Sequence, residues 1–220
     1  MQYQWILFDA DETLFHFDAF AGLQRMFQRF SVQFTHADYL TYQAVNQPLW
    51  IEYQDGDISA LELQQRRFQC WADKLGVTAS LLNDDFLDAM AEICAPLPGA
   101  VNLLSALQGK VKLGIITNGF TALQERRLAH TGLQQLFEFV VISEEVGVAK
   151  PDIGIFDVAF SQMCDADKSR ILMVGDNLHS DILGGNNAGV DTCWLNASQQ
   201  AVDSEITPNY EVKSLAEWIP

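Results

Sequence analysis

Two aspartates near the amino terminus have the spacing needed for chemistry on a phosphate ester. Asp9 and Asp11 follow the short apolar run of residues 5–8 and belong to the pattern Asp-x-Asp-x-Thr, which ends at Thr13. Side chains two residues apart on an extended chain point the same way, so both carboxylates can face one pocket. One carboxylate can attack phosphorus as a nucleophile. The other can protonate the leaving oxygen and later activate water.

A turn that carries a hydroxyl group follows a second apolar run, residues 111–116. Thr117, Asn118 and Gly119 place a short hydroxyl before a flexible turn that begins a helix. The hydroxyl and the backbone N–H groups of such a turn all donate hydrogen bonds, which suits a bound anion. These three residues are therefore candidates for binding phosphate.

A lysine and two further acids follow the next two apolar runs. Lys150 precedes Pro151, which we expect at the first position of a helix, and its ammonium can neutralise a phosphate oxygen and keep a nucleophilic carboxylate ionised. Asp176 and Asp181 can hold a hard cation such as Mg²⁺, which prefers oxygen ligands. Each feature alone has an ordinary explanation, such as a surface lysine or a helix cap. Together, at four strand ends, they predict a phosphoryl-transfer site.

The elements that must bring these residues together alternate along the second half of the chain. Helical patterns near residues 99–107, 121–129, 152–163 and 181–188 alternate with apolar runs at 111–116, 139–142, 171–174 and 191–195. This order favours right-handed crossovers and a parallel sheet covered on both faces. Residues 5–8 are expected to be a further strand of that sheet, buried on both faces. The predicted fold class is α/β, a doubly wound parallel sheet with its ligands beyond the carboxyl ends of the strands.

The stretch between the first strand and Pro98 shows helical periodicity and no strand pattern. Ser59 and Glu62 form a capping box that opens a helix, and Gly76 is expected to end that helix. Large apolar residues recur at helix spacing before it, namely Phe17, Phe20, Leu23, Phe27 and Phe30. We therefore predict a catalytic core formed by residues 1–15 and 96–220. A helical domain, residues 16–95, is predicted to be inserted after the first strand and to lie over the edge of the sheet.

The composition limits the partners and the location of the chain. Its 220 residues include 13 Lys+Arg and 29 Asp+Glu, a formal charge of −16, so it repels nucleic acid and anionic membranes. The remaining partner class is a small-molecule substrate. The run 5–8 is too short for the core of a signal peptide, and no stretch approaches the ~18 apolar residues of a membrane span. The four cysteines, Cys70, Cys94, Cys164 and Cys193, lie far apart, which favours reduced thiols and a cytoplasmic protein.

The four motifs, in this order, resemble those of the haloacid dehalogenase superfamily in its phosphatase branch. The resemblance implies that Asp9 is the nucleophile and Asp11 the general acid and base. It also implies that Thr117 and Lys150 bind phosphate. An acid at position 11 disfavours carbon–halogen cleavage, because the dehalogenase members lack it. The helical insertion resembles that superfamily's cap domain, which closes over the site and excludes water.

The same resemblance implies a magnesium site. Mg²⁺ would be held by the Asp9 side chain, the Asp11 backbone carbonyl and Asp176, with Asp181 in support. The cofactor expected from the sequence is therefore Mg²⁺, with all four aspartates at or beside it.

Longer segments resemble a narrower family, the bacterial pyrimidine 5′-nucleotidases. The likeness is visible in residues 8–17, 44–50, 114–123 and 141–152. It implies hydrolysis of UMP, dUMP and dTMP, and in some members of non-standard pyrimidine nucleotides. No base-recognition motif can be identified from the spacing. Trp50 and Tyr53 could stack on a base, although aromatic residues at helical spacing more often belong to a core.

Other functions stay open at this point. A phosphatase for sugar phosphates or other small metabolites, or a phosphomutase of the same fold, would need the same four motifs. A non-catalytic module that only accepts a phosphoryl group is a third reading. Asp11 and the large insertion argue against it, because a simple acceptor needs neither a second acid nor a lid. The oligomeric state is not predicted.

Overall fold

The computed structural model describes residues 2–163, 167–201 and 205–218. The chain forms two compact units. The first unit contains the described residues of Met1–His16, Ala95–Gly119 and Thr131–Pro220, and the second contains Phe17–Cys94 and Phe120–His130. The second unit thus takes up residues 120–130, a segment that the sequence pattern assigns to the core.

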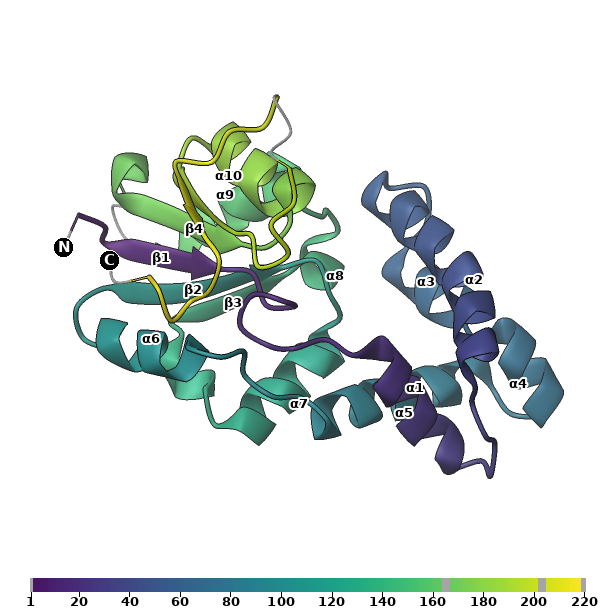
Figure 1. The fold of residues 1–220 in the computed structure, drawn as a ribbon. Coiled ribbons are helices and arrows are strands. Elements are labelled where there is room, and N and C mark those ends of the chain that lie inside the picture. The colour runs from purple at the N-terminus through teal and green to yellow at the C-terminus, as the bar shows by residue number, and fades with distance from the viewer. Residues whose placement is uncertain (1, 164–166, 202–204, 219–220) are drawn as a thin grey trace. The chain divides into compact units, whose positions relative to one another are not determined.

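The first unit is built on one parallel sheet (Figure 1). Its strand order is β3-β2-β1-β4-β5-β6, so the first strand lies in the middle with β2 on one side and β4 on the other. The doubly wound parallel sheet is therefore confirmed. The strands are β1 (Trp5–Phe8), β2 (Lys112–Thr117), β3 (Phe139–Ile142), β4 (Ile171–Gly175), β5 (Asp191–Leu195) and β6 (Tyr210–Val212).

Burial explains why these segments are strands of a covered sheet. All residues of β1 and β4 are buried, as expected when helices cover both faces. α6 (Ala100–Leu107) packs on one face, and α9 (Ile153–Gln162) and α10 (Leu183–Ala188) pack on the other (Figure 1). Right-handed crossovers require this division, because the chain moves outward from β1 in both directions. The core between β3 and α9 contains Phe139, Ile155 and Phe156.

The second unit is helical. Its helices are α1 (Ala19–Gln28), α2 (His36–Gln54), α3 (Ala60–Arg66), α4 (Gln69–Leu75), α5 (Ala79–Glu92) and α7 (Thr121–Thr131). In residues 17–94 every helix or strand that the structure assigns is a helix, as the periodicity predicts. Thr35 and Ser59 open α2 and α3 with capping boxes that satisfy backbone N–H groups at the helix start.

The prediction of one helix from Ser59 to Gly76 is wrong. The chain forms α3 and α4, with the break at Arg67 and Phe68. Both side chains are buried there, and the Arg67 guanidinium lies over the Phe68 ring and donates to Asn83 Oδ1. Turning these side chains inward interrupts the regular helix. Gly76 does end α4, in the left-handed conformation at φ +67°.

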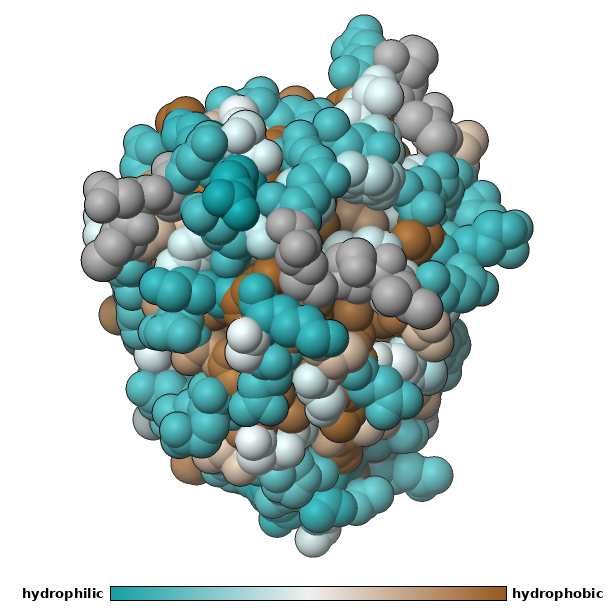
Figure 2. All heavy atoms as spheres, turned by 90° about the vertical axis from the view of Figure 1, so that its left-hand side faces the viewer, coloured by the Kyte–Doolittle hydropathy of each residue, from teal (hydrophilic) through white to brown (hydrophobic). Residues whose placement is uncertain are grey.

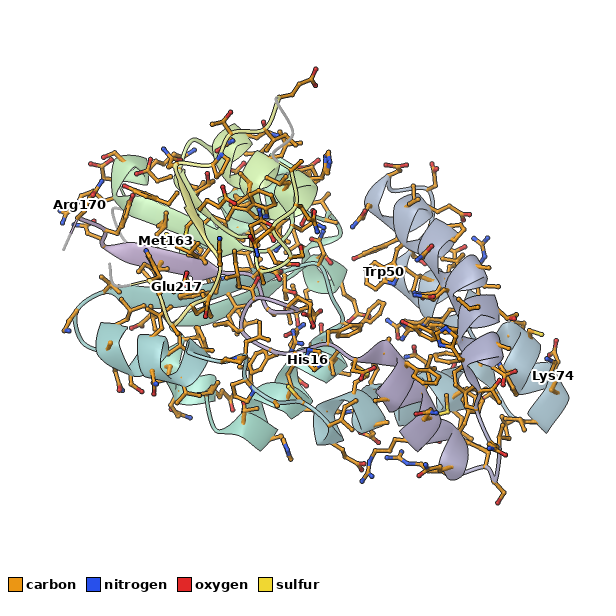
Figure 3. All side chains as sticks on the ribbon, in the orientation of Figure 1. His16, Trp50, Lys74, Met163, Arg170 and Glu217 are labelled. Atoms are coloured by element: carbon orange, nitrogen blue, oxygen red, sulfur yellow. The ribbon has the colours of Figure 1, made fainter. Side chains whose placement is uncertain are left out.

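Two aromatic side chains singled out from the sequence lie at the end of α2. Tyr53 is buried, and Trp50 is half-buried with its ring 5.7 Å from that of Tyr53. The ring of Trp50, which is labelled in Figure 3, also lies 5.3 Å from the ring of Phe120. Tyr53 is therefore a core residue, while a stacking role for Trp50 stays a prediction.

Within the described residues, five short elements were not predicted from the sequence. They are α8 (Ser143–Val146), β6, the π-helical turn Leu178–Ile182 and the 3₁₀-helical turns Gln134–Leu136 and Lys168–Arg170. The expected reduced thiols are present at Cys70, Cys94 and Cys193, and Cys164 lies outside the described residues. Within the described ranges, no helix is both long and apolar enough to cross a membrane.

Candidate functional site

The register of the sheet places Asp9 at its centre. Phe8 pairs with Ile115 on one side and with Val174 on the other, and the Asp9 N–H donates to the Val174 carbonyl at 2.9 Å. Asp9 thus leaves the carboxyl end of β1 between the ends of β2 and β4. The strand order reverses at this position, which is where open α/β sheets place their ligands.

Lys150 is buried beside Asp9, with 1% of its surface exposed. Its ammonium donates three hydrogen bonds, to Asp9 Oδ1 at 2.6 Å, Asp181 Oδ1 at 2.7 Å and the Ile116 carbonyl at 2.7 Å. Burial lowers the pKa of Lys150, but attraction to Asp181 and Asp9 outweighs burial and raises the pKa above its ordinary value. The lysine therefore stays charged and fixes the orientation of the Asp9 carboxylate.

Asn118 holds the backbone of Lys150. Its Nδ2 donates to the Lys150 carbonyl at 2.8 Å, and its Oδ1 accepts from the Lys150 N–H at 2.7 Å. The amide side chain is thus committed to the protein, and phosphate binding by Asn118 would use its backbone N–H. Contrary to the prediction, Pro151 does not begin a helix. It follows a cis peptide bond, and α9 begins at Ile153 with Asp152 as its N-cap.

Three carboxylates meet at this end of the sheet. Asp9, Asp176 and Asp181 each offer a carboxylate oxygen within 4.8 Å of the other two. Burial, followed by repulsion from Asp9 and Asp181, raises the pKa of Asp176 to about 8. Burial raises the pKa of Asp181 to about 6, against the opposing attraction of Lys150 and with added repulsion from Asp9. The three carboxylates therefore repel one another, and a bound cation would relieve this repulsion.

Asp181 stabilises the loop that carries Asp176 through hydrogen bonds. Its Oδ2 accepts from the Asn177 N–H at 3.0 Å, and its Oδ1 accepts from Lys150 and from Ser180 Oγ at 3.2 Å. A side chain at Gly175 would collide with it, because a Cβ there would lie 2.2 Å from Asp181 Oδ2. Glycine at the end of β4 therefore allows Asp181 to approach the strand.

The remaining predicted residues lie on the neighbouring segments. Asp11 is half-buried in a tight turn after β1, closed by hydrogen bonds from the Leu14 and Phe15 N–H groups to the Ala10 carbonyl. Thr13 is fully buried, and its Oγ1 has no hydrogen-bond partner in the part of the chain that the structure describes. Thr117 is buried at the end of β2, next to the Ile116 carbonyl that Lys150 contacts, and Gly119 follows two residues later.

Sequence reasoning missed one residue of this site. Trp194 on β5 donates its indole N–H to the backbone carbonyl of Asp176 at 2.7 Å. No motif could have identified it, because its partner is a main-chain oxygen and its side chain otherwise resembles any buried aromatic.

A separate cavity lies at the opposite end of the sheet, where β1 and β2 begin. It has a volume of about 850 Å³, and its lining includes Tyr3, Lys110, Lys112 and Arg170. Arg170 is labelled there in Figure 3, and Figure 2 faces this side, where hydrophilic residues predominate around small apolar areas. The three clustered aspartates do not line this cavity, so it is distinct from the candidate site.

Comparison with known proteins gives a family match over most of the chain. The model of the haloacid dehalogenase-like hydrolases matches residues 3–189. This range includes every residue of the candidate site except Trp194.

Two curated relatives and one solved structure are similar over nearly their full lengths. The pyrimidine 5′-nucleotidase YjjG of Escherichia coli is 58% identical over 217 residues, 99% of this chain and 96% of the relative. The pyrimidine 5′-nucleotidase PynA of Streptococcus pneumoniae is 36% identical, over 97% of this chain and 92% of the relative. The crystal structure of the putative HAD-hydrolase YfnB of Bacillus subtilis, bound to magnesium, has a TM-score of 0.83 at 31% identity, covering 98% of this chain and 96% of that one.

Proposed function

Because the chain belongs to the haloacid dehalogenase-like hydrolase family, we propose that it is a phosphoric monoester hydrolase acting on pyrimidine nucleoside 5′-monophosphates. The substrates are UMP, dUMP and dTMP, with non-standard pyrimidine nucleotides as a further class. The contact of buried Lys150 with Asp9 and Asp181 carries the chemical part of this proposal. The 58% identity to a pyrimidine 5′-nucleotidase supports the choice of substrate.

The first half-reaction transfers the phosphoryl group to Asp9. The carboxylate oxygen that Lys150 leaves free attacks phosphorus, forming an Asp9–phosphate bond as the bond to the nucleoside 5′-oxygen breaks. Asp11 gives its proton to that leaving oxygen. The Thr117 hydroxyl and the N–H groups of Asn118 and Gly119 donate to the phosphoryl oxygens. Lys150, whose three donors are already bonded, stabilises the same oxygens through its positive charge.

The second half-reaction releases phosphate. Asp11, now ionised, removes a proton from a water molecule that attacks the phosphorus of the acylphosphate. The Asp9–phosphate bond breaks, inorganic phosphate leaves and the Asp9 carboxylate is restored. Because the acid of the first step is the base of the second, one residue at position 11 serves both.

The acidic group fits a divalent cation. Coordination of a cation requires all three carboxylates to be ionised. Together with one ammonium they then leave two uncompensated negative charges, which matches one Mg²⁺. Hard oxygen donors are those that Mg²⁺ prefers, and it usually keeps water and substrate phosphate as its other ligands. Asp9 and Asp176 would hold the ion together with the Asp11 carbonyl, and Asp181 would support them. Bound there, Mg²⁺ neutralises charge on the phosphoryl group.

Two further proposals concern the helical insertion and the location. The helical insertion, residues 16–95, would act as the cap domain that excludes water during transfer. The protein would work in the cytoplasm, a location that the reduced thiols of Cys70 and Cys193 support.

The proposal is tested by measuring phosphate release from a panel of phosphomonoesters. The wild type and Asp9→Asn are assayed with and without Mg²⁺, on pyrimidine and purine nucleotides and on sugar phosphates. Wild-type activity should require Mg²⁺ and favour pyrimidine monophosphates. Asp9→Asn should lose at least ~10³-fold in turnover, because the amide cannot serve as the nucleophile.

Each alternative gives a different result in the same experiment. Equal rates on sugar phosphates would remove the nucleotide assignment and keep the phosphatase chemistry. An isomerised sugar phosphate without free phosphate would indicate a mutase. A phosphorylated protein that does not turn over would indicate an acceptor module, and substantial turnover by Asp9→Asn would refute the covalent mechanism.

A further inference from the structure

The loop that carries Asp176 and Asp181 is fixed from the side by Trp194. β4 and β5 pair so that Gly175 lies opposite Trp194, which brings the indole beside the first residue of the loop. The indole N–H donates to the Asp176 carbonyl at 2.7 Å, a short hydrogen bond for a nitrogen donor. Trp194 therefore holds the main chain of a proposed metal ligand, not its carboxylate.

The direction of this N–H is set by packing. Trp194 is 1% exposed, and its ring belongs to a small apolar cluster with Leu178, Ile182 and Ile206. Leu178 and Ile182 are the two ends of the π-helical turn that contains Asp181. Trp194 thus bonds to the loop at Asp176 and belongs to the same apolar cluster as both ends of the following turn.

The loop needs such a support because its acids repel their neighbours. Asp176 lies within 4.8 Å of Asp9 and Asp181, and Lys150 bonds to the latter two. Among the described residues, no ion pair gives the Asp176 side chain a cationic partner comparable to Lys150. A backbone bond that fixes Asp176 removes conformational freedom that metal binding would otherwise have to remove.

We propose that Trp194 is a positioning residue for the divalent cation, through its N–H bond to the Asp176 carbonyl. This inference rests on the proposed function, since it requires that the three acids bind Mg²⁺. It assigns to β5 a part in metal affinity in addition to its place in the sheet.

The test is Trp194→Phe, which keeps an aromatic ring in the cluster and removes the N–H. Binding of Mg²⁺ is measured from the rise in thermal midpoint over a Mg²⁺ titration, starting from protein treated with chelator. The apparent Kd for Mg²⁺ should increase about 10-fold, the lower end of the effect of losing a residue that supports metal ligands. At saturating Mg²⁺, kcat should stay within about threefold of the wild type.

Trp5→Phe is the matched control. Trp5 is also a buried tryptophan on a strand of the same sheet, but it lies at the start of β1, the end of the sheet away from the acids. Its substitution should lower the midpoint of the metal-free protein and leave the Kd for Mg²⁺ unchanged. A purely structural role for Trp194 would give this same pattern, and would overturn the proposal.

The titration of the wild type and of Trp194→Phe distinguishes failure of the proposed metal site from failure of the positioning role. If wild-type protein shows no Mg²⁺-dependent rise in midpoint, the proposed metal site fails, and the role of Trp194 fails with it. If the wild type responds and Trp194→Phe responds equally, only the positioning role fails. Should Trp194→Phe fail to fold, benzothienylalanine at position 194 preserves the size of the indole and replaces N–H by sulfur, and the same shift in Kd is expected.

Discussion

At the scale of single residues, the positive charge of Lys150 offsets the repulsion between the neighbouring carboxylates of Asp9 and Asp181. A buried ammonium with three acceptors around it has no donor left over, so its position is determined by Asp9, Asp181 and the Ile116 carbonyl together. The same three bonds explain why Asp9 keeps one oxygen engaged and one available for attack. Charge balance and orientation of the nucleophile therefore come from one side chain.

Lys150→Met should remove this charge while retaining much of the volume. We expect kcat/KM to fall at least ~10²-fold, as when one donor that stabilises developing charge is removed. We also expect a loss of about 3–5 kcal/mol in the free energy of unfolding, because two buried carboxylates lose their partner. Steady-state kinetics and urea unfolding measure the two effects. Lys213→Met is the control, because Lys213 is exposed and its ammonium donates only a surface hydrogen bond to Gln199 among the described residues. A kcat/KM within threefold of the wild type would contradict the role of Lys150.

At the scale of elements, the strands could be predicted where apolar runs are long enough to be buried on both faces. β1, β3 and β5 begin and end at the predicted residues, and each run is followed by a polar residue, namely Asp9, Ser143 and Asn196. β6 was missed because its three residues are exposed or half-buried and show no apolar run. α8 was missed because Ser143–Val146 is a single helical turn next to the motif lysine, too short for a periodic signal.

For the candidate site as well, some features could be predicted from the order of the chain and others depend on contacts made in the folded structure. The sequence predicts which strand ends carry acids, a hydroxyl and a lysine, because parallel strands bring their carboxyl ends together. It does not predict that Asn118 would bind the Lys150 backbone or that Trp194 would bind the Asp176 carbonyl. Both contacts join a side chain to a main-chain atom, whose position depends on the finished fold.

Gly175, the last residue of β4, lies against the Asp181 side chain of the candidate site, so a change at this strand end also changes the site. In Gly175→Ala the new Cβ would lie 2.2 Å from Asp181 Oδ2, so Asp181 must move away from Lys150 and from the Asn177 N–H. We expect turnover at saturating Mg²⁺ to fall at least ~10-fold, with a loss of about 1–3 kcal/mol in stability from overpacking. Kinetics and thermal unfolding of the same samples measure both.

Gly185→Ala separates the two effects of that substitution. Its Cβ would lie 2.5 Å from the Thr192 side chain, a comparable collision between α10 and β5. This variant should lose stability and retain turnover. If Gly175→Ala also retains turnover, the position of Asp181 does not matter for the reaction.

At the scale of the whole molecule, the charge of −16 acts against an anionic substrate. The general field lowers the local concentration of nucleotide, so binding depends on cations placed at the site itself. Lys150 supplies one positive charge, and the proposed Mg²⁺ supplies two. Binding of an anionic substrate at the candidate site therefore depends on the positive charge that the acids hold there.

Groups that lose a proton at alkaline pH affect the stability of the whole molecule. In the residues described, burial raises the pKa of Cys193 to about 12 and raises that of Tyr42, while its acidic neighbours raise that of Lys150 despite its burial. A pKa that is higher in the folded than in the unfolded state means that the folded protein holds more protons. Its contribution to stability is complete below the unfolded pKa and is lost as the pH rises toward the folded pKa.

The free energy of unfolding should therefore decrease as the pH rises from about 9 toward 11, beginning where the thiol of unfolded Cys193 ionises. Urea unfolding of chelator-treated protein at intervals across this range measures the decrease. In Cys193→Ala the decrease should be smaller, since the alanine has no proton to lose. Cys70→Ala, which removes an exposed thiol, should follow the wild type. Parallel curves for all three proteins would show that the Cys193 thiol remains protonated in the unfolded chain or ionises equally in both states, contrary to its burial in the sheet.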